Sequence, residues 1–218
     1  MIEITGNHLL PKSDYLEFTK LNDSAQFDFL TLPVIKDRFE KHPYIAKVDV
    51  EYTGNNSVKV YLTEKNIEAV LLAGSEPQFI SDDFHILPML QDTKAQDIPV
   101  ISNPQIEKSG ALPSLFKTDG MVEAFKIIEA AKLTNENIYK RLSEINLRNG
   151  GDIILTISGI KPPVLFGKGE AAKKMVYLDI MWNGMNESSD LMKSSEYIDL
   201  RFANEIYVGT SDKTGLSE

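Results

Sequence analysis

Apolar and polar residues follow two kinds of spacing along the first third of the chain. Ile2 and Ile4 alternate with polar neighbours, and two stretches with apolar residues three or four positions apart come next. Alternation then returns over residues 48–52 and 58–62, on either side of Gly-Asn-Asn. This order predicts a β-α-α-β-β unit whose closing hairpin has one buried face.

The remaining chain mixes both kinds of spacing. Strands are predicted at 67–74, within 77–87, on both arms of a hairpin over 143–158, and at 164–167; helices are predicted at 119–133, after 134, and up to Gly184. Residues 97–113 are punctuated by Pro, Ser and Gly and are expected to form a loop. The sequence therefore predicts an α+β protein, in which the small first unit precedes a mixed β domain with helices packed on its sheet.

A long alternation occupies residues 196–210. Its apolar side chains all stand at even positions: Ile198, Leu200, Phe202, Ile206 and Val208. A two-residue hairpin at 203–204 would turn Glu205 to the buried face and would expose Ile206 and Val208. The pattern thus favours one continuous strand. A hairpin with a three-residue loop also keeps the parity and is the alternative.

Such a strand so near the end of the sequence has an open edge unless another strand flanks it. Residues 198–209 contain neither Pro nor Lys, the residues that commonly protect an edge from foreign strands. An open edge offers main-chain N–H and C=O groups that an extended peptide can complete. We expect either a peptide-binding edge here or a strand that is paired on both sides within its own sheet.

Composition narrows the possible functions. The 218 residues carry a net charge of −9 and contain no cysteine, which excludes disulfides, thiolate metal sites and cysteine nucleophiles. The acidic balance and the lack of a basic cluster argue against a nucleic-acid surface. No run of about 18 apolar residues is present, so no segment is predicted to cross a bilayer.

Few residues suggest chemistry. His8, His42 and His85 lack partners at metal-ligand spacing and are predicted to lie at the surface or in turns. The sequence FGKGE at 166–170 lacks the spacing and the Ser/Thr of a phosphate loop, and predicts a strand-to-helix turn that presents Lys168 to a partner carboxylate. No nucleophile, base and orienting group assemble, so an enzyme is not predicted. A hydrolase would instead require a deep pocket lined by convergent carboxylates.

Several stretches together resemble the FtsQ/DivIB family of bacterial cell-division proteins. IEITGNHLLPKSDY (2–15) and HPYIAKVDVEYTGNNSVKVYLTEKNIEAVL (42–71) are similar to the POTRA domain of that family. PQFISDDFHIL (77–87), IPVISN (98–103), VLFGKGEAAKKMVYLDIMW (164–182) and YIDLRFANEIYV (197–208) resemble its second, β domain. The sequence departs from the family pattern at Lys65–Ile67, where a Pro is usual, and at Asp83-Phe84, where Asp-Gly is usual.

The resemblance implies a POTRA-like domain over residues 1–72, an FtsQ-type β domain over 73–210 and a flexible tail over 211–218. It implies a scaffold of the divisome without a cofactor, which binds FtsB, paired with FtsL, while other division proteins contact the POTRA-like domain. Nucleic acids and small-molecule substrates are not expected. The implied location is the periplasmic side of the bacterial inner membrane, with a single membrane anchor in the full-length protein.

Carried over by position, the resemblance implies a partner edge made of Phe202, Ala203, Asn204, Glu205, Ile206, Tyr207 and Val208. Lys168 matches a basic family position near that edge, and Tyr207 is the expected aromatic anchor. The alternative is another POTRA-bearing component of envelope assembly or translocation. That protein would have its main binding edge in the first domain, on the Glu51 to Glu64 hairpin or near Ile2.

Overall fold

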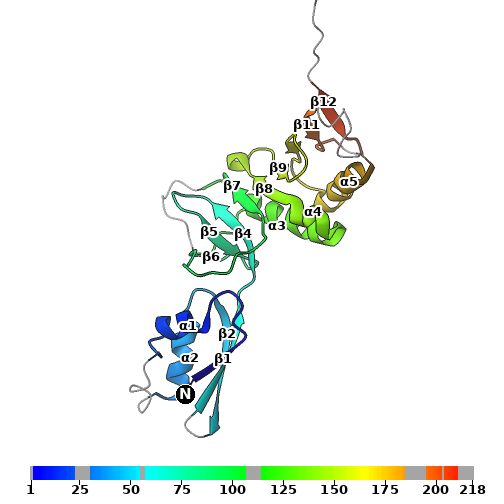
Figure 1. Ribbon diagram of the computed structural model, residues 1–218. Helices are drawn as coiled ribbons and strands as arrows, with labels where there is room; N and C mark the ends of the chain where they lie inside the picture. Colours follow the sequence, from blue (N-terminus) through cyan, green and yellow to red (C-terminus); the bar gives the residue numbers. More distant parts are fainter. Residues whose placement is uncertain are drawn as a thin grey trace, which may run out of the picture. The chain divides into compact units, whose positions relative to one another are not determined.

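The computed structural model describes residues 2–22, 30–54, 57–106, 114–184, 195–202 and 204–210. These residues form two compact units. The first unit contains the described residues up to Ile67 together with Ser81–Asp83 and Leu87–Gln96, and the second contains the others from Glu68 on. Each unit has the mixed helix and strand content of an α+β protein (Figure 1). The tail predicted at 211–218 lies outside the described residues.

The first unit is a three-stranded sheet with two helices. Its elements in chain order are β1 (Ile2–Thr5), α1 (Lys12–Phe18), α2 (Leu32–Glu40), β2 (Ile45–Gly54) and β3 (Ser57–Glu64). Strand β3 lies in the centre, parallel to β1 and antiparallel to β2. The predicted β-α-α-β-β order and the predicted hairpin are therefore confirmed.

The alternation of apolar and polar side chains along the strands determines which residues form the core of this unit. Val48 and Val60 point inward from the hairpin and are fully buried, as are Ile35 and Phe39 on one face of α2. At the end of β3, the Glu64 carboxylate accepts hydrogen bonds from the His8 and Leu9 main-chain N–H groups, at 2.7 and 2.9 Å, and from the Tyr15 hydroxyl. One acidic side chain thereby ties the turn after β1 to β3.

His42 lies in the turn between α2 and β2, as one of the two predicted positions required, but its side chain is buried in the core of the first unit, which was not predicted. Its side chain is 2% exposed and packs against the rings of Tyr15, Phe18 and Tyr44. The main-chain N–H of Tyr44 donates a hydrogen bond to His42 Nδ1 at 3.1 Å. Burial lowers the pKa of His42 to about 4, so the imidazole is neutral at pH 7.

In the second unit, the described strands of a long sheet follow the order β12-β11-β10-β9-β8-β7-β4-β5-β6. The strands and helices in chain order are β4 (Ile67–Leu72), β5 (Gln78–Ser81), β6 (Ile86–Leu87), β7 (Val100–Ser102), α3 (Asp119–Thr134), α4 (Glu136–Arg141), β8 (Leu142–Asn146), β9 (Ile154–Ile157), β10 (Val164–Leu165), α5 (Ala171–Gly184), β11 (Ser195–Asp199) and β12 (Tyr207–Thr210). Parallel pairs join β4 to β7, β7 to β8, and β10 to β11, and the other registered pairs are antiparallel.

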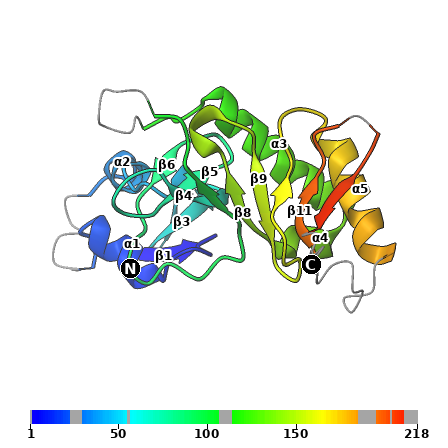
Figure 2. The same ribbon diagram turned by 90° about the horizontal axis from the view of Figure 1, so that it is seen from above.

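Two helices make the crossovers between parallel strands and build the core. Helix α3 connects β7 to β8 and α5 connects β10 to β11, and the two helices pack side by side against the sheet (Figure 2). Buried apolar residues of both helices join those of the strands in one cluster, for example Ile128, Leu155, Met175 and Ile198. The crossovers carry the chain to the end of the sheet where β11 and β12 lie.

Strand β7 lies within residues 97–113, where the sequence predicted only a loop. It contains three residues and pairs in parallel with β4 on one side and β8 on the other. The carbonyl of Pro99 also accepts a hydrogen bond from the Val70 N–H at 3.0 Å. A strand this short shows little alternation, and its pairing depends on neighbours that are distant in sequence.

Candidate functional site

The last two strands form an antiparallel hairpin at one end of the sheet. Ile198 pairs with Val208 and Asp199 pairs with Tyr207, so the even-numbered residues remain in step. The prediction of one continuous strand was therefore wrong, and a hairpin, the alternative that keeps the parity, is present with a longer loop over residues 200–206. The continuous strand is interrupted because Asn204 has a φ of 66°, in the left-handed region that extended strands do not use.

Strand β12 is the terminal strand of the described sheet. It pairs with β11 on one side, and its outer edge pairs with none of the described strands. The sequence left two arrangements open, an open edge and a strand paired on both sides within its own sheet. Among the described residues, β12 has the open edge. The edge extends over four residues, Tyr207–Thr210.

The predicted edge residues divide between the loop and the strand. Phe202, Asn204 and Glu205 are exposed in the loop, and Ile206 and Val208 are half-buried. Ala203 lies outside the described residues. Tyr207 begins β12, is 48% exposed and donates a hydrogen bond from its hydroxyl to the Glu205 carboxylate, which raises the pKa of Tyr207.

An apolar hollow adjoins this edge. Tyr177, Ile180 and Met181 of α5 line it together with Ile206 and Val208, and its volume is about 300 Å³. Ile180 is 63% exposed, which is unusual for an isoleucine on a packed helix. The hollow gives the end of the sheet a surface that can accept apolar side chains.

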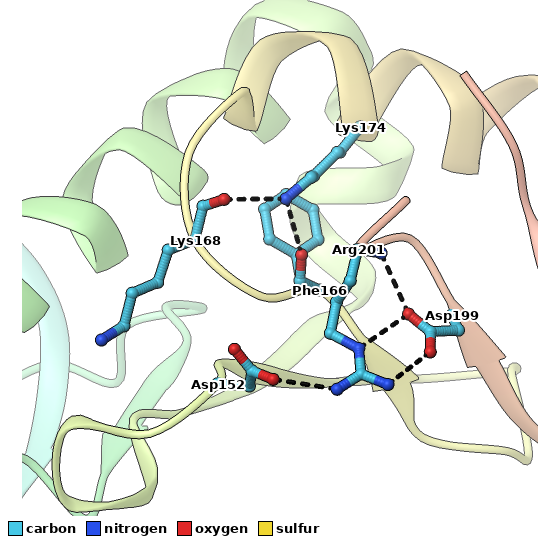
Figure 3. A network of polar contacts seen from close by, with 6 residues as sticks. All are labelled: Asp152, Phe166, Lys168, Lys174, Asp199 and Arg201. Atoms are coloured by element: carbon cyan, nitrogen blue, oxygen red, sulfur yellow. Dashed lines mark hydrogen bonds and ion pairs between the residues drawn. The ribbon is translucent and has the colours of Figure 1, made fainter. Parts of the chain in front are cut away.

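Arg201 anchors the start of the loop (Figure 3). Its Nε and Nη2 donate to the two carboxylate oxygens of Asp199, at 2.9 and 2.6 Å, and its Nη1 donates to Asp152 Oδ2 at 2.9 Å. Asp199 is 3% exposed, and the hydrogen bonds from Arg201 lower the pKa of its carboxyl group. Two carboxylates from different segments thus share one guanidinium.

The turn that carries Lys168 is held by a buried ammonium group. Lys174 is 6% exposed, and its Nζ donates to the carbonyl oxygens of Phe166 and Lys168, at 2.8 and 3.0 Å (Figure 3). Burial lowers the pKa of Lys174. The main-chain N–H of Gly169 donates to the Glu123 carboxylate at 3.0 Å. This framework fixes the turn predicted at 166–170.

Lys168 itself is exposed on this turn, and its Nζ points away from Arg201 (Figure 3). It donates a hydrogen bond to the Gly150 carbonyl oxygen at 2.7 Å. The structure thus pairs the cation with an uncharged acceptor.

Sequence reasoning missed two parts of this region. Asp199 and Arg201 stand two positions apart, so their side chains start on the same side of an extended chain, and this spacing could have indicated their ion pair. Tyr177 and Ile180 stand three positions apart on α5 and both line the hollow, so this spacing could have indicated it. The contribution of Asp152 has no comparable local signal because it depends on the fold.

The described residues contain neither a metal-binding cluster nor a membrane-spanning helix. No group of three or more His, Asp or Glu side chains there could hold a metal ion. Within the same residues, no helix has the length and apolar character needed to span a membrane. The features that remain are the open edge, the hollow beside it and the polar contacts of Arg201.

Comparisons with known proteins match both units. Residues 1–65 match the POTRA domain of the FtsQ type, and residues 69–201 match the C-terminal domain of the cell division protein FtsQ/DivIB. The cell division protein FtsQ of Geotalea daltonii is 21% identical over 207 residues, which cover 95% of this chain and 74% of the relative. The match to the C-terminal domain ends at Arg201 and so does not include the loop from Phe202 or strand β12. These residues belong to the candidate site on the basis of their geometry.

Proposed function

Because this chain belongs to the FtsQ/DivIB family of cell division proteins, we propose that it is a non-enzymatic scaffold of the divisome. In this role it binds a membrane-anchored coiled-coil partner of the FtsB type, paired with an FtsL-type protein, during septation. The contact is strand addition at the outer edge of β12. The same proposal places both domains on the periplasmic side of the bacterial inner membrane.

The observation that carries this proposal is the terminal position of β12 in the described sheet. The main-chain groups on its outer edge pair with no described strand, and an extended peptide can complete them as the next strand of the ladder. Main-chain pairing supplies affinity with little demand on the partner's sequence, so specificity must come from side chains.

The surroundings of β12 define that specificity. Val208 lines the apolar hollow beside α5, whereas its neighbour Tyr207 stands at the next position of the pleat. A strand laid along β12 therefore places every second side chain on the side of the hollow, and apolar residues suit those positions. Lys168, on the turn before α5, offers a positive charge for an acidic residue of the partner.

The two domains have separate roles in this proposal. The β domain over residues 73–210 carries the FtsB-type site, and the POTRA-like domain over residues 1–72 contacts other division proteins. The long edge strand β2 of the first unit is a second candidate edge. It serves as the internal comparison in the experiment below.

Disulfide scanning tests the contact directly, since the chain contains no native cysteine. Tyr207→Cys, Val208→Cys and Thr210→Cys are each combined with single cysteines along the extracytoplasmic part of the FtsB-type protein from the same genome. Strand addition predicts that the cross-linked partner residue shifts in register with the β12 position, with the partner's strongest positions two residues apart. Tyr52→Cys on β2 is the control. Cross-links at Tyr52→Cys and none along β12, in a complex that forms, would contradict the proposal.

A further inference from the structure

Arg201 connects three segments that are far apart in the sequence. Its guanidinium bonds to Asp199 at the end of β11 and to Asp152 just before β9. Its own main-chain N–H also donates to Asp199 Oδ1 at 3.0 Å. We call this set of contacts, made by Asp152, Asp199 and Arg201, the Arg201 clamp.

The third segment is the turn at Gly167. This glycine has a φ of 67°, and a Cβ atom placed there would lie 2.8 Å from Arg201 Cγ. The absence of a side chain at Gly167 therefore makes room for the aliphatic part of Arg201, which lies against the turn. The turn itself is fixed from the other side by Lys174 and Glu123.

The geometry of the clamp requires an arginine. A planar guanidinium can donate two parallel hydrogen bonds to Asp199 and a third in another direction to Asp152, whereas the compact ammonium group of lysine cannot reproduce this fork. Asp199 is nearly inaccessible, so its charge depends on a partner inside the protein. The geometry therefore restrains the direction in which the chain leaves β11.

The residue after the clamp is Phe202. From there the chain turns back through Asn204 and enters β12 at Tyr207, whose ring meets that of Phe202. Residues 200–202 are held by the clamp, by this ring contact, by the bond from the Leu200 N–H to the Leu165 carbonyl at 2.9 Å, and by the burial of the Leu200 side chain in the core. The first residues of the loop that leads into β12 are thus restrained.

We infer that Arg201 is a positioning residue for strand addition, because its clamp holds the loop so that β12 keeps its outer edge in the geometry that an incoming strand requires. This inference rests on the proposed function. A clamped edge is ready before the partner arrives, which reduces the ordering that binding would otherwise require. Loss of the clamp should therefore slow association more than it speeds dissociation.

Two variants weaken the clamp while leaving the core residues in place. Arg201→Lys keeps the positive charge and most of the aliphatic stem but loses the fork to Asp199, and Asp152→Asn removes only the negative charge of the exposed partner. Lys140→Met is the matched control, because it breaks an exposed ion pair with Glu136 on α4 instead. Amide hydrogen exchange of the free proteins is measured by mass spectrometry, together with the association rate of the FtsB-type extracytoplasmic fragment.

The clamp predicts about fivefold faster exchange over residues 204–210 in Arg201→Lys and a smaller increase in Asp152→Asn, which keeps both bonds to Asp199, with unchanged exchange in β8 and β9. It also predicts slower association of the partner fragment, and wild-type behaviour for Lys140→Met. Unchanged exchange over 204–210, uniformly faster exchange in the whole sheet, or faster local exchange with wild-type association would each overturn the inference. If the wild-type protein does not bind the fragment, the proposed function fails, and the exchange measurement alone decides the role of the clamp.

Discussion

Phe202 and Tyr207 meet edge to face at the base of the loop between β11 and β12, with ring centroids 5.0 Å apart and ring planes at 72°. Both rings are about half exposed. Two exposed aromatic side chains that support each other are well suited to contact a partner, because little conformational freedom remains to be lost on binding.

Replacing Phe202 by Ala removes one of the two rings and with it the contact to Tyr207. Because the aromatic pair contributes about 0.5–1.5 kcal/mol within the free protein and supports the ring of Tyr207, its loss should lower the melting temperature by a few degrees. Partner affinity should fall by about two- to tenfold, because Phe202 no longer contacts the partner and Tyr207 is less ordered before binding. Isothermal titration calorimetry with the FtsB-type fragment measures the affinity. Leu133→Ala, at an apolar side chain of α3 that is 80% exposed, is the matched control. A similar loss of affinity in both variants would remove Phe202 from the site.

Much of the fold follows from local sequence patterns. The hairpin of the first unit is fixed by alternation, with Val48 and Val60 on the buried side, and helix α3 begins after Thr118, whose side chain caps the Met121 N–H. The family resemblance supplied the same domain order. These features could be predicted because each depends on residues close together in the chain.

The candidate site could be predicted only in part. Residue parity selected the segment that forms the terminal hairpin, and its hairpin alternative is compatible with the pairing of Ile198 with Val208, but it could not locate the reversal at Asn204. The loop that contains the reversal starts next to Arg201, and Arg201 is held partly by Asp152, 49 residues earlier. The burial of His42 was missed for a similar reason, since its aromatic surroundings combine Tyr15 and Phe18 of α1 with Tyr44 of the turn before β2.

Charge reversal at Lys168 tests its proposed contribution to partner binding. Lys168→Glu should reduce the association rate of the partner fragment by about two- to tenfold at low salt, because it replaces attraction by repulsion at an exposed position. The effect should shrink as ionic strength rises. Stopped-flow association at several salt concentrations measures it. Lys168→Met separates loss of charge from reversal, and equal rates for all three proteins would exclude Lys168.

Lys174→Met tests the buried ammonium group that holds the Phe166–Glu170 turn. Methionine fills a similar volume but leaves the carbonyl oxygens of Phe166 and Lys168 without this donor, so the second unit should lose about 2 kcal/mol of stability. Urea unfolding followed by the fluorescence of Trp182 reports on this unit. Lys173→Met, at the adjacent and more exposed position, is the control and should remain within about 0.5 kcal/mol of the wild type. Equal stability of both variants would contradict the structural role of Lys174.

His42 predicts acid sensitivity of the first unit. The pKa of His42 falls from 6.5 to about 4 on folding, so between these pH values the unfolded chain binds a proton that the folded chain does not. The stability contribution is complete above pH 6.5 and is lost as the pH falls toward 4, by up to about 2–3 kcal/mol. Protonation at Nδ1 would also remove the acceptor for the Tyr44 N–H.

The measurement is unfolding of the POTRA-like unit at a series of pH values between 4 and 7, for the wild type and for His42→Asn. Asparagine has an oxygen that can accept the Tyr44 N–H but has no proton to gain in this range. The variant should be less stable at pH 7, because it loses ring contacts, and should have a flatter pH profile below 6.5. Parallel profiles for the two proteins would show that His42 does not cause the acid sensitivity.

Amide hydrogen exchange of β12, with and without the FtsB-type fragment, tests the central claim most directly. Strand addition predicts that exchange over residues 207–210 slows by about tenfold or more in the complex, while Ile86–Leu87, in the strand at the other end of the sheet order, is unaffected. A stable complex in which exchange over residues 207–210 is unchanged, with protection along β2 or elsewhere, would contradict it.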